Sequence, residues 1–187
     1  AAQGAIEWSF TDVLPFFKRS EGNERGGDEF HGAGGPLNVM DQRWPNVTSK
    51  RFIESAAALQ LPRTADFNGA QQEGFGLYQV TQKGGERWSA ARAYVEPLRE
   101  HGNFAVRTGA LGEKIIVENG RATGVVIRRG SKRETLRARG GVILSAGAFN
   151  SPQILMLSGI GPGAHLKDKG IDVTLDRAGV GENLQDH

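Results

Sequence analysis

The chain has 187 residues, of which 38% are apolar and 24% charged. This composition is typical of a globular, water-soluble protein, and no apolar run approaches the length that crosses a bilayer. Cysteine is absent, which excludes disulfides and thiolate chemistry. The net charge is +2, and the 27 glycines indicate tight turns or close approaches of the backbone to a ligand.

The two ends of the chain are abrupt. Residues 1–6 contain no initiator methionine and neither the basic nor the apolar region of a signal peptide. With no transmembrane segment, this pattern favours a cytoplasmic location. The last residues, Asp186 and His187, lack a tail or a helix stop. We therefore expect an internal fragment of a longer protein.

The first predicted element is a helix. Ser9, with Asp12 three residues later, forms a capping-box pattern before an apolar run. Pro15 interrupts that run, so the helix should be short or kinked. A loop is expected over 21–35, which is rich in glycine, and a short strand over 36–39.

A second helix should follow, capped by Thr48 or Ser49 and stopped before Pro62. Its apolar residues recur at helical spacing. The next predicted elements are a strand over 77–81 and a helix over about 89–98.

The pattern then changes to a three-stranded antiparallel meander. Asn119-Gly120 is a strong type I′ hairpin signal between two β-rich runs. A second turn over 130–132 leads into a third strand. The predicted strands span residues 114–117, 123–127 and 134–139.

An apolar run over 142–144 predicts a strand buried on both faces. Small residues over 145–148 follow it, where a ligand could approach the backbone. Ser151 is a favourable N-cap, with Pro152 at the first helical position, and the helix should stop at Gly159. A short helix is expected near 165–169. Strand, small-residue turn and helix start form a nucleotide-binding α/β arrangement, with its ligand at the carboxyl end of the strand.

Residues 147–161 carry small residues, Ser-Pro, an aliphatic pair and Ser-Gly-aliphatic-Gly. In this order and spacing they closely resemble the second signature of the glucose–methanol–choline (GMC) oxidoreductases. Within the family, the sequence is most similar to the choline-dehydrogenase-like branch. Further family-like stretches lie in the family's order at residues 8–17, 31–37, 66–69, 87–94 and 179–187.

The resemblance implies an FAD-dependent enzyme that oxidises a small alcohol to an aldehyde or ketone by hydride transfer to flavin. It leaves open which alcohol, and whether oxygen, a dye or a membrane quinone accepts the electrons. The family's dinucleotide fingerprint and catalytic histidine fall outside this chain, so we expect no catalytic residue here and no turnover by these residues alone. The alternatives are a non-catalytic remnant that folds poorly or binds a partner, or a different flavoprotein or nicotinamide enzyme that shares only the nucleotide-binding fold. The family signature argues against the second.

The implied fold class is α/β: part of an FAD-binding domain of the two-dinucleotide-fold type with a β-meander, plus part of an antiparallel substrate domain. In that scheme, residues 1–35 are an extension of the FAD domain, 36–85 belong to the substrate domain, and 86–187 belong to the FAD-binding domain.

Seven residues are candidates for FAD contacts. Small side chains at Ala146 and Gly147 would let the flavin or its ribityl chain pass close to the backbone, although helix packing alone could explain them. By resemblance, Leu111 and Gly112 meet the adenine through the backbone. The family usually has valine where Gly112 stands. The complete set is Leu111, Gly112, Ala146, Gly147, Ser151, Asn183 and Asp186, of which Asn183 and Asp186 could simply cap turns.

The remaining polar residues favour structural or surface roles. None of the four histidines, at positions 31, 101, 165 and 187, stands at the family's catalytic position. No pair of them has metal-ligand spacing, so no metal site is expected. The basic residues over 128–139 flank a turn, where a solvated charged edge is a better interpretation than a nucleic-acid site.

Overall fold

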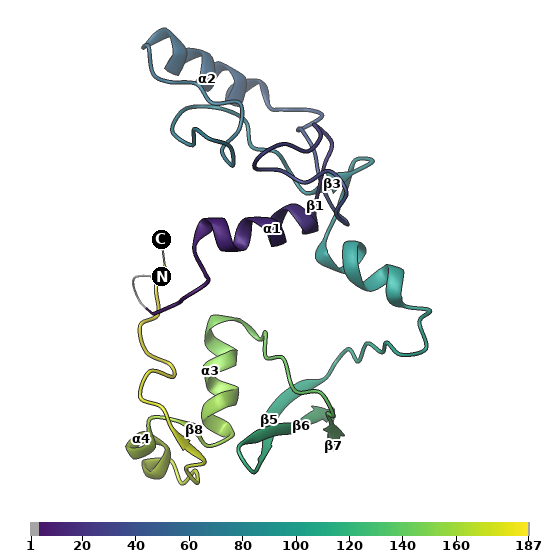
Figure 1. The fold of residues 1–187 in the computed structure, drawn as a ribbon, viewed down its shortest axis with the longest axis vertical. Coiled ribbons are helices and arrows are strands. Elements are labelled where there is room, and N and C mark those ends of the chain that lie inside the picture. The colour runs from purple at the N-terminus through teal and green to yellow at the C-terminus, as the bar shows by residue number, and fades with distance from the viewer. Residues whose placement is uncertain (1–3, 187) are drawn as a thin grey trace. The chain divides into compact units, whose positions relative to one another are not determined.

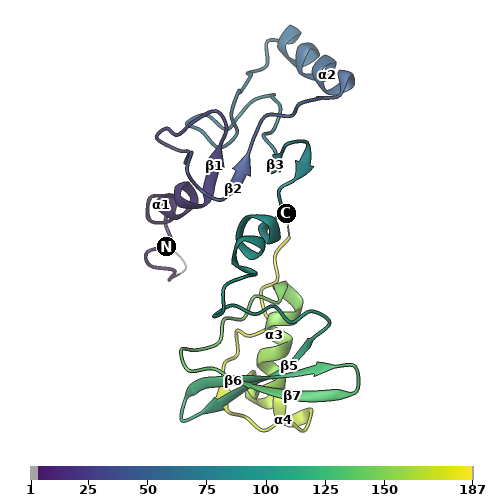
Figure 2. The ribbon, with the colours of Figure 1, turned by 90° about the vertical axis from the view of Figure 1, so that its right-hand side faces the viewer.

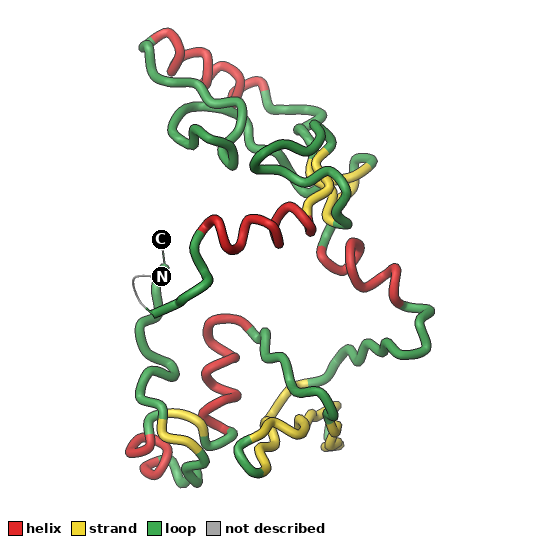
Figure 3. Tube along the Cα trace, viewed as in Figure 1, coloured by secondary structure: helices red, strands yellow, loops and turns green. Residues whose placement is uncertain are grey.

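The computed structural model describes residues 4–186, and the chain divides into two compact units. The N-terminal unit covers residues 1–105 and the C-terminal unit covers 106–187. Figure 1 names their helices and strands, and Figure 3 shows that loops make up much of the N-terminal unit. We describe each unit by itself. The three predicted domain segments remain a prediction.

The N-terminal unit begins with helix α1 (Phe10–Ser20), and its capping box is confirmed. The Ser9 hydroxyl accepts the N–H of Asp12, and the Asp12 carboxylate accepts the N–H of Ser9 at 2.9 Å. Pro15 lies inside the helix, which runs over 11 residues. Proline removes one backbone donor, and the capped first turn precedes it.

The stretch over 21–35 is not entirely a loop as predicted. It begins with strand β1 (Glu21–Asn23), which pairs in parallel with β2 (Leu37–Val39), the strand that the alternation predicted (Figure 2). The sequence pattern did not predict β1, because three residues are too few to show the alternation of a strand.

The second helix, α2 (Val47–Ala58), ends before Pro62 as predicted, but its cap was wrongly assigned. Asn46 is the N-cap, and its side-chain oxygen accepts the N–H of Thr48 at 2.8 Å. Asparagine and serine cap helices about equally well, so local preference could not choose between neighbouring candidates.

The strand predicted over 77–81 is wrong. Within it only Val80 forms a β-bridge, with Met40, and the ladder that follows is the short hairpin β3 (Gln82–Lys83) and β4 (Glu86–Arg87). The next segment is helical as predicted, although not a regular α-helix. It consists of the π-helical turn η1 (Ala91–Val95) and the 3₁₀ turn η2 (Glu96–Leu98).

The C-terminal unit contains the predicted meander. Strands β5 (Leu111–Glu118), β6 (Arg121–Arg129) and β7 (Lys132–Arg137) form one antiparallel sheet in that order. At the first turn Asn119 has φ 52° and Gly120 has φ 74°. Two positive φ values are what a type I′ turn requires, so this prediction is confirmed.

The buried strand predicted over 142–144 is wrong. These residues belong to no strand, and Ile143 is 93% exposed. A strand buried on both faces needs neighbours on each side for its hydrogen bonds and side chains. Within residues 4–186 no strand pairs with this run. Apolar character alone therefore does not make it a strand.

Helix α3 (Gly147–Leu157) begins five residues earlier than predicted. Ser151 is not its N-cap: its hydroxyl accepts the N–H of Ala146 at 3.0 Å from inside the first turns. Pro152 is consequently inside the helix. The predicted stop is confirmed, because Gly159 just beyond the helix has φ 81°, the left-handed conformation common at helix ends.

The chain closes with a small motif that periodicity did not show. Strands β8 (Ile160–Gly161) and β9 (Leu175–Asp176) pair in parallel. Helix α4 (Gly163–Asp168), predicted near this place, lies between them in sequence. Leu166 of this helix is fully buried and forms the centre of the motif.

Candidate functional site

The N-terminus of α3 is the centre of the predicted cofactor site. Its N-cap and first two residues, Ala146, Gly147 and Ala148, have small side chains, and Phe149 follows in the first turn with 75% exposure. Gly147 has φ 89°, and a Cβ built there would meet no atom within 4 Å. The site therefore needs glycine for its backbone conformation, and open space lies in front of it.

Strand β5 packs along α3 in the same direction (Figure 1). A Cβ built on Gly112 would lie 3.7 Å from the Ile154 side chain, and the Ile115 N–H donates to the Ser158 hydroxyl at 2.8 Å. The start of β5 therefore lies beside the C-terminal half of α3. Leu111, at that end, is 54% exposed.

Ser158 is a structural residue that the sequence patterns did not single out. It is 2% exposed, accepts the Ile115 N–H, and donates its own proton to the Ile154 carbonyl at 2.6 Å. The hydroxyl thus joins α3 to β5 at one buried point. Only its place in the family-like Ser-Gly-aliphatic-Gly stretch could have drawn attention to it.

We expect Ser158→Ala to destabilise the protein by about 1–3 kcal/mol, because it leaves the buried Ile115 N–H without an acceptor. Urea unfolding followed by circular dichroism measures the change. Ser55→Ala is the matched control: this hydroxyl is exposed and donates only to the Arg51 carbonyl within α2. Equal unfolding midpoints for the two variants would contradict the role of Ser158 in joining α3 to β5.

The segment after β9 lies against α3. A Cβ built on Gly181 would be 3.5 Å from the Met156 side chain. Asn183 is exposed and has φ 56°, a conformation that asparagine tolerates better than most residues. Asp186 is exposed as well. Asn183 therefore suits this backbone conformation, and its side chain is exposed to solvent.

The structure brings the candidate residues together only in part. Ala146 and Ser151 share a hydrogen bond, and Gly112 faces the same helix across the β5–α3 contact. Asn183 and Asp186 are placed in the same unit through the Gly181–Met156 contact. All seven candidates lie in the C-terminal unit.

Three of the six basic residues over 128–139 pair with carboxylates. Glu113 accepts from Arg128 at 2.8 Å and from Arg133 at 2.6 Å, while Glu118 accepts from Arg137 at 2.7 Å. The hydrogen bond from the Arg133 guanidinium, with that from Arg128, holds the pKa of Glu113 below its usual value. Such exposed pairs are what a solvated sheet edge presents.

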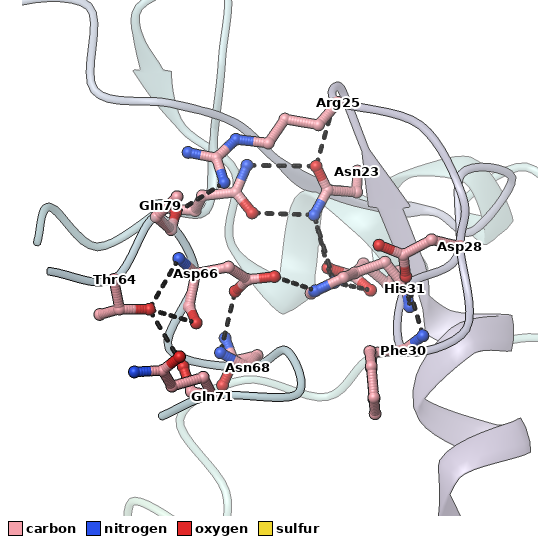
Figure 4. Close-up of polar contacts among 12 residues, drawn as sticks. Asn23, Arg25, Asp28, Phe30, His31, Thr64, Asp66, Asn68, Gln71 and Gln79 are labelled. Carbon is pink, nitrogen blue, oxygen red and sulfur yellow. Dashed lines mark hydrogen bonds and ion pairs between the residues drawn. The ribbon is translucent and has the colours of Figure 1, made fainter. Parts of the chain in front are cut away.

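A separate polar cluster lies in the N-terminal unit around His31 (Figure 4). His31 is 6% exposed; its Nδ1 lies 3.0 Å from a Glu21 oxygen and its Nε2 lies 2.7 Å from an Asp66 oxygen. Burial lowers the pKa of His31, but the hydrogen bonds with Glu21 and Asp66 outweigh it, so the pKa is raised above its usual value. His101 and His165 are exposed, and His187 lies outside the described residues.

Among residues 4–186, no group of three or more histidine, aspartate or glutamate side chains could hold a metal ion. None of the helices in that range combines the length and the apolar character needed to cross a membrane.

Solved structures share this fold. Pyridoxine 4-oxidase from Mesorbium loti matches with a TM-score of 0.82 and 29% identity, over 91% of this chain and 34% of that chain. An FAD-dependent oxidoreductase from Chaetomium thermophilum matches with a TM-score of 0.83 and 25% identity, over 94% and 33%. The meander and the helix beside it thus define a class, the mixed α/β FAD-binding domain of flavin-dependent oxidoreductases.

The family follows from the sequence comparisons. The GMC oxidoreductase model matches residues 1–187, and the chain belongs to this family. Oxygen-dependent choline dehydrogenases from Rhizobium etli and Sinorhizobium fredii are 49% and 50% identical over 184 residues, which are 98% of this chain. The chain spans about a third of the length of these relatives, 33% in each case. FAD is the cofactor that this membership indicates.

Proposed function

We propose that this chain forms part of the cofactor-binding portion of an FAD-dependent enzyme that oxidises an alcohol to an aldehyde or ketone. The observation that supports it is the match to the GMC family along the whole chain, with choline dehydrogenases about half identical to it. Bound FAD would supply the hydride acceptor. The residues of this chain would hold and orient it.

The residues present fit part of such a cofactor. The N-terminus of an 11-residue helix, which begins with small residues, would offer backbone N–H groups to polar cofactor atoms. Ala146 and Gly147 would leave room for the flavin or its ribityl chain, and the Ser151 hydroxyl holds the backbone of that turn. On the strand that packs against α3, Leu111 and Gly112 would meet the adenine. Asn183 and Asp186 would add polar contacts.

The alternative is a non-catalytic piece that binds a partner. Aromatic side chains on α1 and just before it are exposed, which favours partner binding. Trp8 is 74% exposed, Phe16 60% and Phe17 62%. Large apolar groups rarely gather uncovered on a monomer. The same observation is expected of an oxidoreductase in which chain outside these residues covers α1, so the cofactor experiment decides between the two.

The test uses the native-length protein that contains these residues. Purified protein should carry flavin absorbance at one FAD per chain, and it should reduce a dye acceptor or oxygen when an alcohol is added. The name of the relatives makes choline the first alcohol to assay. Protein that folds cooperatively but neither retains nor takes up FAD would overturn the proposal in favour of the partner-binding alternative.

Ala146→Leu in the native-length protein should lower the FAD content by about tenfold or more, because the added side chain would occupy the space proposed for the cofactor. Flavin absorbance is read beside thermal unfolding after FAD removal. Ala164→Leu, at an exposed position on α4, is the control and should keep full FAD. Gly147→Val is less informative, since the φ of 89° strains any side chain. Stoichiometric FAD in Ala146→Leu would show that the site is only a packing position.

A further inference from the structure

Two family-like stretches far apart in the sequence meet in the N-terminal unit. His31 opens the stretch over 31–37 and Asp66 opens the stretch over 66–69. Their side chains are joined at 2.7 Å between His31 Nε2 and Asp66 Oδ2 (Figure 4). Neither residue is among the candidate FAD contacts, so the proposed cofactor site does not account for this hydrogen bond.

The hydrogen-bond geometry favours a doubly protonated imidazole. Both ring nitrogens of His31 face carboxylate oxygens, Glu21 at 3.0 Å and Asp66 at 2.7 Å. A carboxylate only accepts, and a neutral imidazole has only one N–H to donate. The Asn23 amide lies 3.4 Å from Nδ1, but its two protons are directed to Glu21 at 3.0 Å and Gln79 at 2.9 Å. Donation from both nitrogens of His31 is therefore the arrangement that satisfies both ionised carboxylates.

The surrounding charges favour that imidazolium. Besides Glu21 and Asp66, the Asp28 carboxylate accepts the His31 backbone N–H at 2.7 Å. The nearby cations are engaged elsewhere. Arg25 pairs with Asp41 at 2.6 Å, and Lys18 donates to the carbonyl oxygens of Asp28 and Glu29. No cation is bonded to either carboxylate that faces the ring, as far as the described residues show.

The cluster joins two segments of irregular structure. Residues 24–36 and 64–79 contain no regular helix or strand. Arg25 also donates to the Ala65 carbonyl at 2.9 Å, so the His31 contacts are one of the links between the two segments. A cavity of about 320 Å³ is lined by both segments, through Phe30, His31 and Asn68, together with residues of α1 and β2.

We propose that the His31 imidazolium is a pH-dependent clip that fastens the loop over 24–35 to the segment over 64–79 and opens when the ring loses its proton. In the neutral ring one nitrogen lone pair faces a carboxylate, so one of the two bonds turns repulsive. The clip therefore controls the order of both segments and of the cavity between them.

The sign of the pH dependence follows from the raised pKa of His31. A raised folded-state pKa means that the clip contributes its full stability below the unfolded-state pKa. That contribution is lost as the pH rises through the folded-state pKa, so the clip opens on the alkaline side. Each pH unit across this interval changes the opening equilibrium by about tenfold.

Hydrogen exchange on the native-length protein tests the clip, read by mass spectrometry between about pH 6 and pH 10 and corrected for intrinsic exchange. Peptides covering 24–35 and 64–79 should lose protection by about tenfold for each pH unit within the interval. The meander over 111–129 should stay protected and serves as the internal reference. Unchanged protection of the two segments across the whole range would overturn the proposal.

Variants separate a clip from a purely structural histidine. His31→Gln should show low protection in both segments at every pH, whereas His101→Gln, at an exposed position, should keep the wild-type profile. Asp66→Asn is the second variant if His31→Gln does not fold. It keeps an oxygen that accepts from Nε2 but removes one charge, so the opening midpoint should fall by about one pH unit or more. A midpoint unmoved in Asp66→Asn, or a wild-type profile in His31→Gln, would contradict the clip.

Discussion

Gly32→Ala should unfold the N-terminal unit. A Cβ built on Gly32 would lie 1.8 Å from the Lys18 carbonyl oxygen and 2.6 Å from its carbon. These are backbone atoms of the last turns of α1, so the clash can be relieved only by moving the helix away from the loop. We expect a loss of about 3 kcal/mol or more, at the upper end of overpacking effects. Urea unfolding and the disappearance of protected amides in α1 measure it.

The same loop supplies a matched control. A Cβ built on Gly34 would meet nothing within 4 Å, and its φ lies outside the left-handed region. Gly34→Ala should be neutral or slightly stabilising, because alanine has less conformational freedom to lose on folding. Wild-type stability in Gly32→Ala would contradict the close approach. A loss in Gly34→Ala as large as in Gly32→Ala would show that the effect is not steric.

Leu166→Ala should cost about 2–5 kcal/mol, the range for removing a large side chain from a packed core. Leu166 is 0% exposed, and its methyl groups lie against Gly161 of β8, where a built Cβ would be 3.6 Å away. Because it is the centre of the small motif after α3, its loss should loosen α4 and the β8–β9 pair together. Thermal unfolding and amide protection in residues 160–176 provide the readouts.

Leu157→Ala is the control for this prediction. Leu157 ends α3 in the same unit and is 45% exposed, so truncation should cost about 1 kcal/mol or less. If both variants lose the same stability, the buried position of Leu166 is not what supports the motif. A Leu166→Ala protein with wild-type stability would contradict the burial of Leu166.

The elements predicted correctly depend on neighbours in the sequence. The Ser9–Asp12 capping box and the Asn119-Gly120 turn are made within four residues, so local stereochemistry decides them. The glycine stop at Gly159 is of the same kind. GMC membership was also readable, since the signature over 147–161 is a continuous stretch.

The errors arose where several local solutions were about equally good or where a distant partner was needed. Asn46 displaced Thr48 and Ser49 as the cap of α2, and α3 began before Ser151 although Ser-Pro is a favourable start. Residues 142–144 have strand composition, but a strand forms only when another strand pairs with it, and none does among residues 4–186.

The sequence by itself determined the meander, the helix signals and, through its family signature, the flavin-dependent class of the protein. Tertiary structure alone decided that Asp66 would hold His31 across 35 positions and that Ser158 would accept from Ile115 across 43. It also decided that Gly32 must be glycine because α1 passes directly beside it. The physical reason is that turns and caps gain their energy from adjacent residues, whereas buried polar contacts and close approaches exist only after the chain has folded back on itself.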